Sequence, residues 1–177
     1  WDVQERNGIS RSEALDGSHF TVEMETGTGK TYVYLRTIFE LNKVYGLTKF
    51  VIVVPSIAIR EGVLASIRQF GEHLTGMYLE PFDAAMYDSK QLGRVRQFAT
   101  SNTIQILVMN IQAFQKDALE GDVADLSANV INRPHDSMAG RKPIEFIQAV
   151  RPVVVLDEPQ NFESEGARTA IDRLHPL

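Results

Sequence analysis

Residues 24–31, METGTGKT, have the composition and spacing of a loop that binds phosphate. In such a loop glycines let backbone N–H groups converge on phosphate oxygens, a lysine reaches the terminal phosphates, and the next hydroxyl holds a magnesium ion. Gly27, Gly29, Lys30 and Thr31 occupy these places, although a methionine replaces the first glycine of the usual G-x-x-x-x-G-K-[ST] pattern. The alternative is a glycine turn that only precedes a helix. The phosphate loop is the better interpretation because a strand is predicted before it and a helix after it.

A second group of reactive side chains stands in residues 153–162, VVVLDEPQNF, where an apolar run ends in two carboxylates. A strand of this kind can carry one carboxylate to the magnesium shell of a bound nucleotide, while its neighbour orients or deprotonates an attacking water. We therefore expect Asp157 to be the metal partner and Glu158 the base. Taken alone, the pair could equally be a solvated strand end, but the phosphate loop upstream favours the catalytic interpretation.

The elements that must position these residues alternate between short apolar runs and segments with helical periodicity. Strands are predicted at 20–24, 49–55, 104–110 and 153–158. Helices are predicted at 31–46, 57–74, 88–100 and 144–152, with Gly46 as a C-terminal cap of the first. Residues 76–87 fit neither pattern. Continuous apolar strands separated by helices predict a mostly parallel sheet that is covered on both faces.

Length and composition predict a single domain over residues 1–177, with an irregular insertion at 111–142 that is rich in Gly, Pro, Asn and Asp. The formal charge of −5 indicates that any contact with nucleic acid is local. The chain lacks cysteine and has no apolar run near the ~20 residues of a membrane span, so we expect a cytoplasmic location without a membrane partner. Because the sequence begins with Trp1 rather than Met, we expect it to be a fragment of a longer protein.

One family with such parts is that of the ABC transporter ATPases, in which an L-S-G-G-Q signature precedes a strand that ends in L-D-E-P. The corresponding residues here are Met138, Ala139, Gly140 and Arg141, so the serine and the double glycine are not reproduced. A transporter-type ATPase therefore remains only as an alternative.

The chain more closely resembles superfamily 2 helicases and translocases, and within them the restriction (Res) subunit of type III restriction-modification enzymes. The resemblance covers about residues 20–162 and is carried, in this order, by METGTGKTYVYLRTIFELN, FVIVVPSIAIREGV, DSKQLGRVRQFATSNTIQILVMNIQAF and SMAGRKPIEFIQAVRPVVVLDEPQ. It implies a RecA-like P-loop NTPase fold, a three-layer α/β/α sandwich, with ATP and Mg²⁺ as cofactors.

The same resemblance implies roles for individual residues. TGTGKT is similar to helicase motif I and DEPQ to motif II. Nucleotide contacts are then expected from Glu25, Thr26, Gly27, Thr28, Gly29, Lys30, Thr31 and Gln160, with Thr31 and Asp157 on the metal and with Glu158 and Lys30 as catalytic residues.

The segment VPSIAIREG is similar to motif Ia, which touches the nucleic-acid backbone in such motors. Ser56 and Arg60 are therefore candidate phosphate contacts, since hydroxyl and guanidinium groups suit that task. The alternative is that Ser56 only caps the following helix and that Arg60 is a solvated charge. Phe114, in the similar-looking segment MNIQAF, is expected in the core rather than on a base.

At the level of the whole protein, the resemblance implies a DNA-dependent ATPase and translocase coupled to type III endonuclease activity. The expected partners are DNA, a modification methyltransferase subunit, and a second RecA-like domain and a nuclease domain in the same full-length chain. The isolated chain is expected to hydrolyse little or no ATP, because it lacks the arginine fingers of the second domain. A degenerate nucleotide-binding scaffold is a further alternative, which the intact lysine, threonine and acidic pair disfavour.

Overall fold

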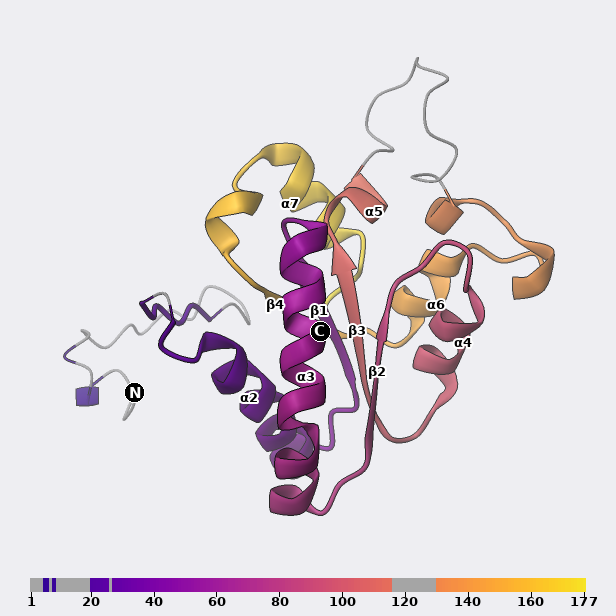
Figure 1. Cartoon of the computed structure of the whole chain (residues 1–177). Helices are drawn as coiled ribbons and strands as arrows, with labels where there is room; N and C mark the ends of the chain where they lie inside the picture. The colour runs from indigo at the N-terminus through magenta and orange to yellow at the C-terminus, as the bar shows by residue number, and fades with distance from the viewer. Residues whose placement is uncertain (1–4, 7, 9–19, 26, 116–129) are drawn as a thin grey trace.

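The computed structural model describes residues 5–6, 8, 20–25, 27–115 and 130–177. Its centre is a sheet of four parallel strands in the order β2-β3-β1-β4 (Figure 1). The strands are β1 (Lys49–Val54), β2 (Phe82–Met86), β3 (Ile104–Asn110) and β4 (Val153–Leu156). Because they are parallel, their carboxyl ends meet at one edge of the sheet, where ligands of open α/β sheets bind.

Alternate side chains of β1 enter two different cores. Phe50, Ile52 and Val54 belong to one cluster of buried side chains, whereas Val51 and Val53 belong to the other. This alternation follows from the two-residue period of a strand. The uninterrupted apolar run of β1 is thus explained by burial on both faces of the sheet.

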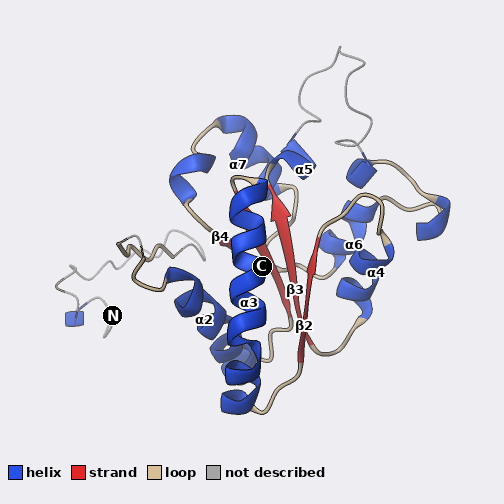
Figure 2. Cartoon of the chain, viewed as in Figure 1, coloured by secondary structure: helices blue, strands red, loops and turns tan. Residues whose placement is uncertain are grey.

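Helices cover both faces of the sheet (Figure 2). One face carries α2 (Lys30–Tyr45) and α3 (Ile57–Tyr78), and the other carries α4 (Gly93–Thr100), α6 (Pro143–Ala149) and α7 (Glu165–Asp172). Shorter helical segments are α5 (Gln112–Gln115), η2 (Val130–Asn132), η3 (Asp136–Met138) and η4 (Pro159–Phe162). The predicted three-layer α/β/α fold with a parallel sheet is confirmed.

Local signals set the ends of the two long helices. The backbone of Gly46 is left-handed (φ 70°), and its N–H donates to the carbonyl of Asn42 at 2.7 Å, which confirms the predicted cap of α2. At the start of α3, the Ser56 side chain accepts a hydrogen bond from the Ile59 N–H at 3.3 Å.

Most predicted elements are present, with shifted ends. Strand β2 lies within residues 76–87, which the apolar pattern left unassigned, because an edge strand with half-buried side chains has no strong pattern. The helix predicted from residue 88 begins at Gly93, since the preceding residues form a turn in which Asp88 Oδ1 accepts the Lys90 N–H at 2.9 Å.

The strand predicted at 20–24 is absent, and that prediction is wrong for this chain. Residues 20–25 are described without regular structure, and Phe20 and Val22 are 78% and 70% exposed. A strand needs a partner, and β1, the next strand along the chain, already has β3 on one side and β4 on the other.

The insertion predicted at 111–142 falls partly on residues 116–129, which lie outside the described residues. The described residues on both sides of that gap contribute buried side chains to the core, namely Ile111, Phe114, Ile131 and Met138. Phe114 is 1% exposed, so its predicted place in the core is confirmed.

Candidate nucleotide-binding site

The glycine loop adopts backbone conformations that favour glycine. Gly27 and Gly29 have φ angles of 80° and 94°, in the left-handed region. A Cβ atom added at either position would meet no other atom within 4 Å, so the space above the loop is open. Thr26, which was also expected to contact nucleotide, lies outside the described residues.

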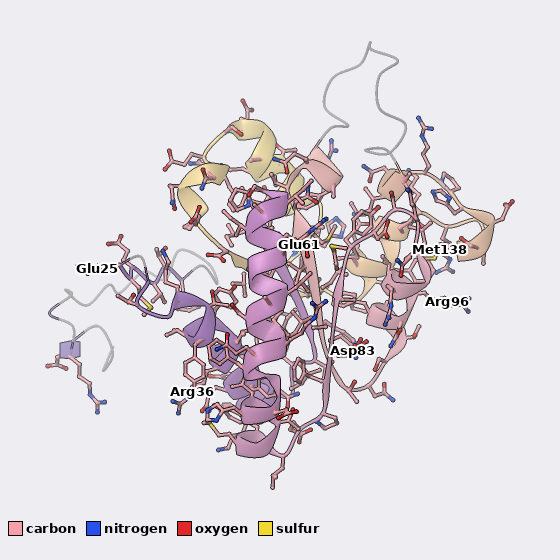
Figure 3. All side chains as sticks on the ribbon, in the orientation of Figure 1. Glu25, Arg36, Glu61, Asp83, Arg96 and Met138 are labelled. Atoms are coloured by element: carbon pink, nitrogen blue, oxygen red, sulfur yellow. The ribbon has the colours of Figure 1, made fainter. Side chains whose placement is uncertain are left out.

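The loop leads directly into the first turn of α2. The Thr28 hydroxyl donates to the carbonyl of Glu25 at 2.6 Å, which closes the turn, and Figure 3 shows Glu25 on the segment that enters the helix. Gly29 is the N-cap, and Lys30 and Thr31 are the first two helical residues. Unpaired N–H groups at the start of this 16-residue helix, together with Lys30, create an environment that favours an anion.

The acidic pair follows β4 at the carboxyl edge of the sheet. In the register of β1 and β4, Val53 lies opposite Leu156, and the Asp157 N–H continues the ladder by donating to the Val53 carbonyl at 3.0 Å. Asp157 and Glu158 are both half-buried. The strand therefore holds the backbone of Asp157 in place.

Tyr34 connects the two motifs. Its hydroxyl donates to Asp157 Oδ2 at 3.3 Å, across 123 residues of sequence. Tyr34 stands one turn after Lys30 and Thr31 on α2, so the helix that follows the loop also contacts the first carboxylate of the pair. The structure thus brings Thr31 and Asp157, the two predicted metal ligands, to neighbouring positions around Tyr34.

The electrostatics of this site suit a cation. Burial raises the pKa of the Asp157 carboxyl above its ordinary value, and the charge of Glu158 raises it further. The hydrogen bond from Tyr34 and the positive charge of Lys30 act in the opposite direction. Burial and the Asp157 charge also raise the pKa of Tyr34, which keeps its hydroxyl protonated as a donor. A cation beside Asp157 would offset the cost of its buried charge.

Glu158 has an unusual backbone for its residue type. Its φ of 60° lies in the left-handed region, which costs a non-glycine residue about 1–2 kcal/mol. Asn161 supports this conformation, since its side-chain amide donates to the Glu158 carbonyl at 3.2 Å and to Oε2 at 3.3 Å. Gln160 lies on the exposed η4 turn, and no hydrogen bond joins its side chain to the described residues.

The donor set fits magnesium better than a metal held entirely by protein. Within the described ranges, no group of three or more His, Cys, Asp or Glu side chains could enclose a metal ion. Magnesium usually keeps waters and binds one or two carboxylates together with substrate phosphates. One carboxylate from Asp157 and one hydroxyl from Thr31 match that pattern.

The two candidate nucleic-acid contacts lie at the start of α3, beyond the carboxyl end of β1. Ser56 does cap the helix, as its hydrogen bond with Ile59 shows. Arg60 is not a fully solvated charge: its side chain is 15% exposed, and Nη2 lies 3.5 Å from Glu61 Oε1. Its buried Nε has no hydrogen-bond partner among the described residues.

Sequence reasoning missed Tyr34 and Asn161, which hold the acidic pair. Tyr34 counted only as one of the periodic residues of a helix, and its contact with Asp157 depends on how α2 packs beside β4. Asn161 carried a local signal, because an Asn three residues after Glu158 can bond back to its carbonyl in a turn.

Known proteins resemble this chain over most of its length. The family model described as "Type III restriction enzyme, res subunit" matches residues 6–176. The chain belongs to this family. It is 36% identical over 181 residues to the type III restriction-modification enzyme StyLTI Res subunit of Salmonella typhimurium, and 31% identical over 190 residues to the EcoP15I Res subunit of Escherichia coli. The alignments cover 90% and 95% of this chain but only 17% and 18% of those proteins.

Membership in the type III Res family identifies the chain as a helicase-like motor domain of a restriction subunit and gives no support to the transporter interpretation. The chain spans less than a fifth of the length of the Res subunits that it matches. Among the described residues, no helix combines the length and apolar character needed to cross a membrane.

Proposed function

We propose that the chain binds ATP with Mg²⁺ between the glycine loop and the acidic pair and serves as half of an ATP-driven motor. The observation that carries this proposal is the hydrogen bond from Tyr34 to Asp157, which joins the helix of the first motif to the strand of the second. If the first motif were only a glycine turn and the second only a solvated strand end, no hydrogen bond between the two would be expected.

In this proposal the chain's own groups divide the work. Backbone N–H groups of Gly27–Thr31 and the Lys30 ammonium bind the phosphates, and Thr31 and Asp157 hold the metal, which would neutralise phosphate charge. Glu158 takes the proton of the attacking water, and its strained backbone is consistent with a functional position. Gln160 contacts the nucleotide from the exposed η4 turn. The chain alone hydrolyses little ATP, because a second RecA-like domain supplies groups that stabilise the transferred phosphoryl.

We propose further that the full-length protein couples this ATPase to movement along DNA and to cleavage. The support is the family and the printed identity of the relatives as Res subunits of restriction-modification enzymes. The partners are DNA, a modification methyltransferase subunit, and a nuclease domain in the same full-length chain. Ser56 and Arg60 contact the DNA backbone from the start of α3, since hydroxyl and guanidinium groups suit phosphate oxygens.

The test is the ATPase rate of the full-length protein with and without double-stranded DNA. We expect DNA to stimulate the wild-type rate and Lys30→Ala to abolish it, because the ammonium that binds the phosphates is lost. Lys43→Ala is the matched control, since this lysine lies in the last turn of the same helix and is exposed. A Lys30→Ala protein that retains ATP-dependent DNA cleavage would refute the assignment.

A further inference from the structure

A cavity lies on the opposite face of the sheet from the glycine loop. Its volume is about 450 Å³, and its lining comes from η2, from α6 and from the residue after α7, namely Asn132, Lys142, Ile144, Glu145, Gln148 and Arg173. None of these residues was expected to bind nucleotide. Because α6 runs back toward the amino end of β4, its first residues lie toward the same carboxyl edge as the candidate nucleotide site.

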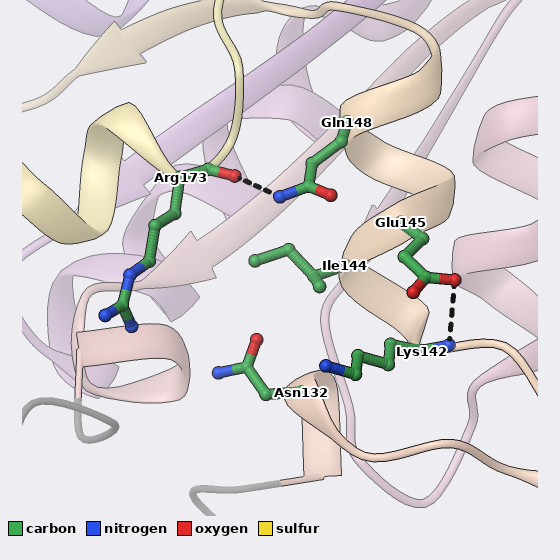
Figure 4. Close-up of a pocket in the computed structure, with 6 residues that line it drawn as sticks. All are labelled: Asn132, Lys142, Ile144, Glu145, Gln148 and Arg173. Carbon is green, nitrogen blue, oxygen red and sulfur yellow. Dashed lines mark hydrogen bonds between the residues drawn. The ribbon is translucent and has the colours of Figure 1, made fainter.

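The frame of the cavity is held by hydrogen bonds that leave its cations free. The Gln148 side-chain amide donates to the Arg173 carbonyl at 2.8 Å, and Glu145 Oε2 accepts the Lys142 backbone N–H at 3.3 Å (Figure 4). These bonds tie α6 to the end of α7 through backbone atoms of Lys142 and Arg173. Among the described residues, neither the Lys142 ammonium nor the Arg173 guanidinium has an acceptor.

The polar ends of three side chains converge on the same opening. Figure 4 shows Lys142, Asn132 and Arg173 around one side of the cavity, whereas the Glu145 carboxylate turns toward the Lys142 backbone. Arg173 is half-buried. An arginine beside a lysine and an amide is a donor set that matches phosphate oxygens.

We propose that this cavity binds a phosphate of the DNA backbone, as a second contact besides the one at the start of α3. Among the described residues, no aromatic side chain lines the cavity, so they offer no surface on which a base would stack, which favours the backbone over a free nucleotide. Arg133 and Arg141, both exposed, adjoin two of the lining residues in sequence and extend the positive charge along the surface. This inference rests on the proposed DNA-dependent function.

The test uses the full-length protein and compares wild type with the double variant Lys142→Gln, Arg173→Gln. The control is Lys43→Gln, Arg68→Gln, which removes the same charge from exposed positions on α2 and α3. Affinity for a double-stranded DNA of fixed sequence is measured over a range of salt concentrations. We expect the variant to bind more weakly and to reduce the slope of log affinity against log salt by about 1, the value for one lost phosphate contact. The control is expected to keep the wild-type slope.

Three results would overturn the proposal, and they have different meanings. If wild type binds DNA and the variant has an unchanged salt slope, the cavity does not contact DNA. The proposed motor function is not affected by that result. Weaker binding of Mg-ATP with unchanged DNA affinity shows that the occupant is a free nucleotide. If wild type does not bind DNA, both this inference and the proposed coupling of the ATPase to DNA are refuted. Circular dichroism of Lys142→Gln, Arg173→Gln separates loss of contact from loss of fold, and Lys142→Arg, Arg173→Lys, which keeps the charges, is expected to keep the wild-type salt slope.

Discussion

At the scale of single residues, Asp157 carries a charge that burial disfavours and that the proposed cation would stabilise. Asp157 lies at a half-buried strand end, where burial opposes its ionisation, while the Tyr34 hydroxyl, the charge of Lys30 and a backbone hydrogen bond from Glu158 favour the charged form. A strand end chosen only for stability would carry a neutral residue there. The charge is useful once a cation stands beside it.

The first prediction concerns Asp157→Asn and pH. Because the folded pKa of Asp157 is raised, its ionised form destabilises the chain, so wild type gains stability as the pH falls through the carboxyl's folded pKa. The Asn variant lacks this cost. In the absence of magnesium and nucleotide, we expect it to have the higher free energy of unfolding at neutral pH, with the difference shrinking as the pH approaches the ordinary carboxyl pKa of 3.8.

The measurement is urea unfolding of both chains across this pH range, with Asp172→Asn as a control at an exposed carboxylate on α7. A difference between Asp157→Asn and wild type that does not depend on pH would contradict the prediction. Adding magnesium and nucleotide should raise the free energy of unfolding of wild type more than that of the Asn variant.

The second prediction concerns Glu158→Gln in the full-length protein. The amide keeps the shape of the side chain but cannot accept a proton, so we expect bound nucleotide and a hydrolysis rate lower by on the order of 10²–10⁴-fold. Equilibrium binding of ATP and single-turnover hydrolysis measure the two effects. Glu163→Gln is the matched control, because that carboxylate is exposed at the end of η4. Loss of binding in Glu158→Gln would instead assign this residue a structural role.

At the scale of elements, the crossovers of the sheet indicate on which side of it a strand at residues 20–24 would lie. The connection from β1 through α3 to β2 runs toward the β2 edge with its helix on one face. The connections from β2 through α4 to β3 and from β3 through α6 to β4 run toward the β4 edge, with their helices on the opposite face. Because both the direction and the face are reversed, all three connections have the same hand. Helix α2 lies on the α3 face. A strand at 20–24 that leads through α2 into β1 with this hand must lie on the β4 side.

The outer edge of β4 is unpaired among the described residues, and the outward side of α2 exposes Val33 and Val44. Both features are unfavourable in an isolated domain, since open edges of apolar strands invite pairing. Additional strands on the β4 side would cover them, and the Res subunits that the chain matches have more than four-fifths of their length outside the alignment.

The third prediction follows from this geometry. In the full-length protein we expect residues 20–24 to form a strand on the β4 side, so their backbone amides and those of β4 exchange hydrogen slowly. In the 177-residue chain the amides of 20–24 are expected to exchange fast, because the segment is exposed and unpaired. Equal exchange of these amides in both proteins would show that the segment is not a strand of the longer protein.

At the scale of the whole molecule, the distribution of charge over the fold limits where DNA could bind. A net charge of −5 provides no general attraction for a polyanion, so affinity must come from local cations. Arg60 lies at the start of α3 and Arg173 beside the cavity on the other face of the sheet. The two-contact model therefore requires DNA to reach cations on both faces of the sheet.

The sequence by itself determined the fold class and supplied the candidate site residues as a prediction. The apolar runs of β1 and β3 required burial on both faces, Gly46 and Ser56 marked helix ends, and TGTGKT and DEPQ indicated the candidate site. These signals are local, because each depends on residues close together along the chain.

Tertiary structure alone decided the features that depend on which segments become neighbours. It paired Tyr34 with Asp157, placed Lys142 beside Arg173, and left the apolar segment 20–24 without a partner. Pattern and propensity describe what a segment can form, whereas a strand exists only where a neighbour offers hydrogen bonds, and a site exists only where packing brings distant side chains within reach.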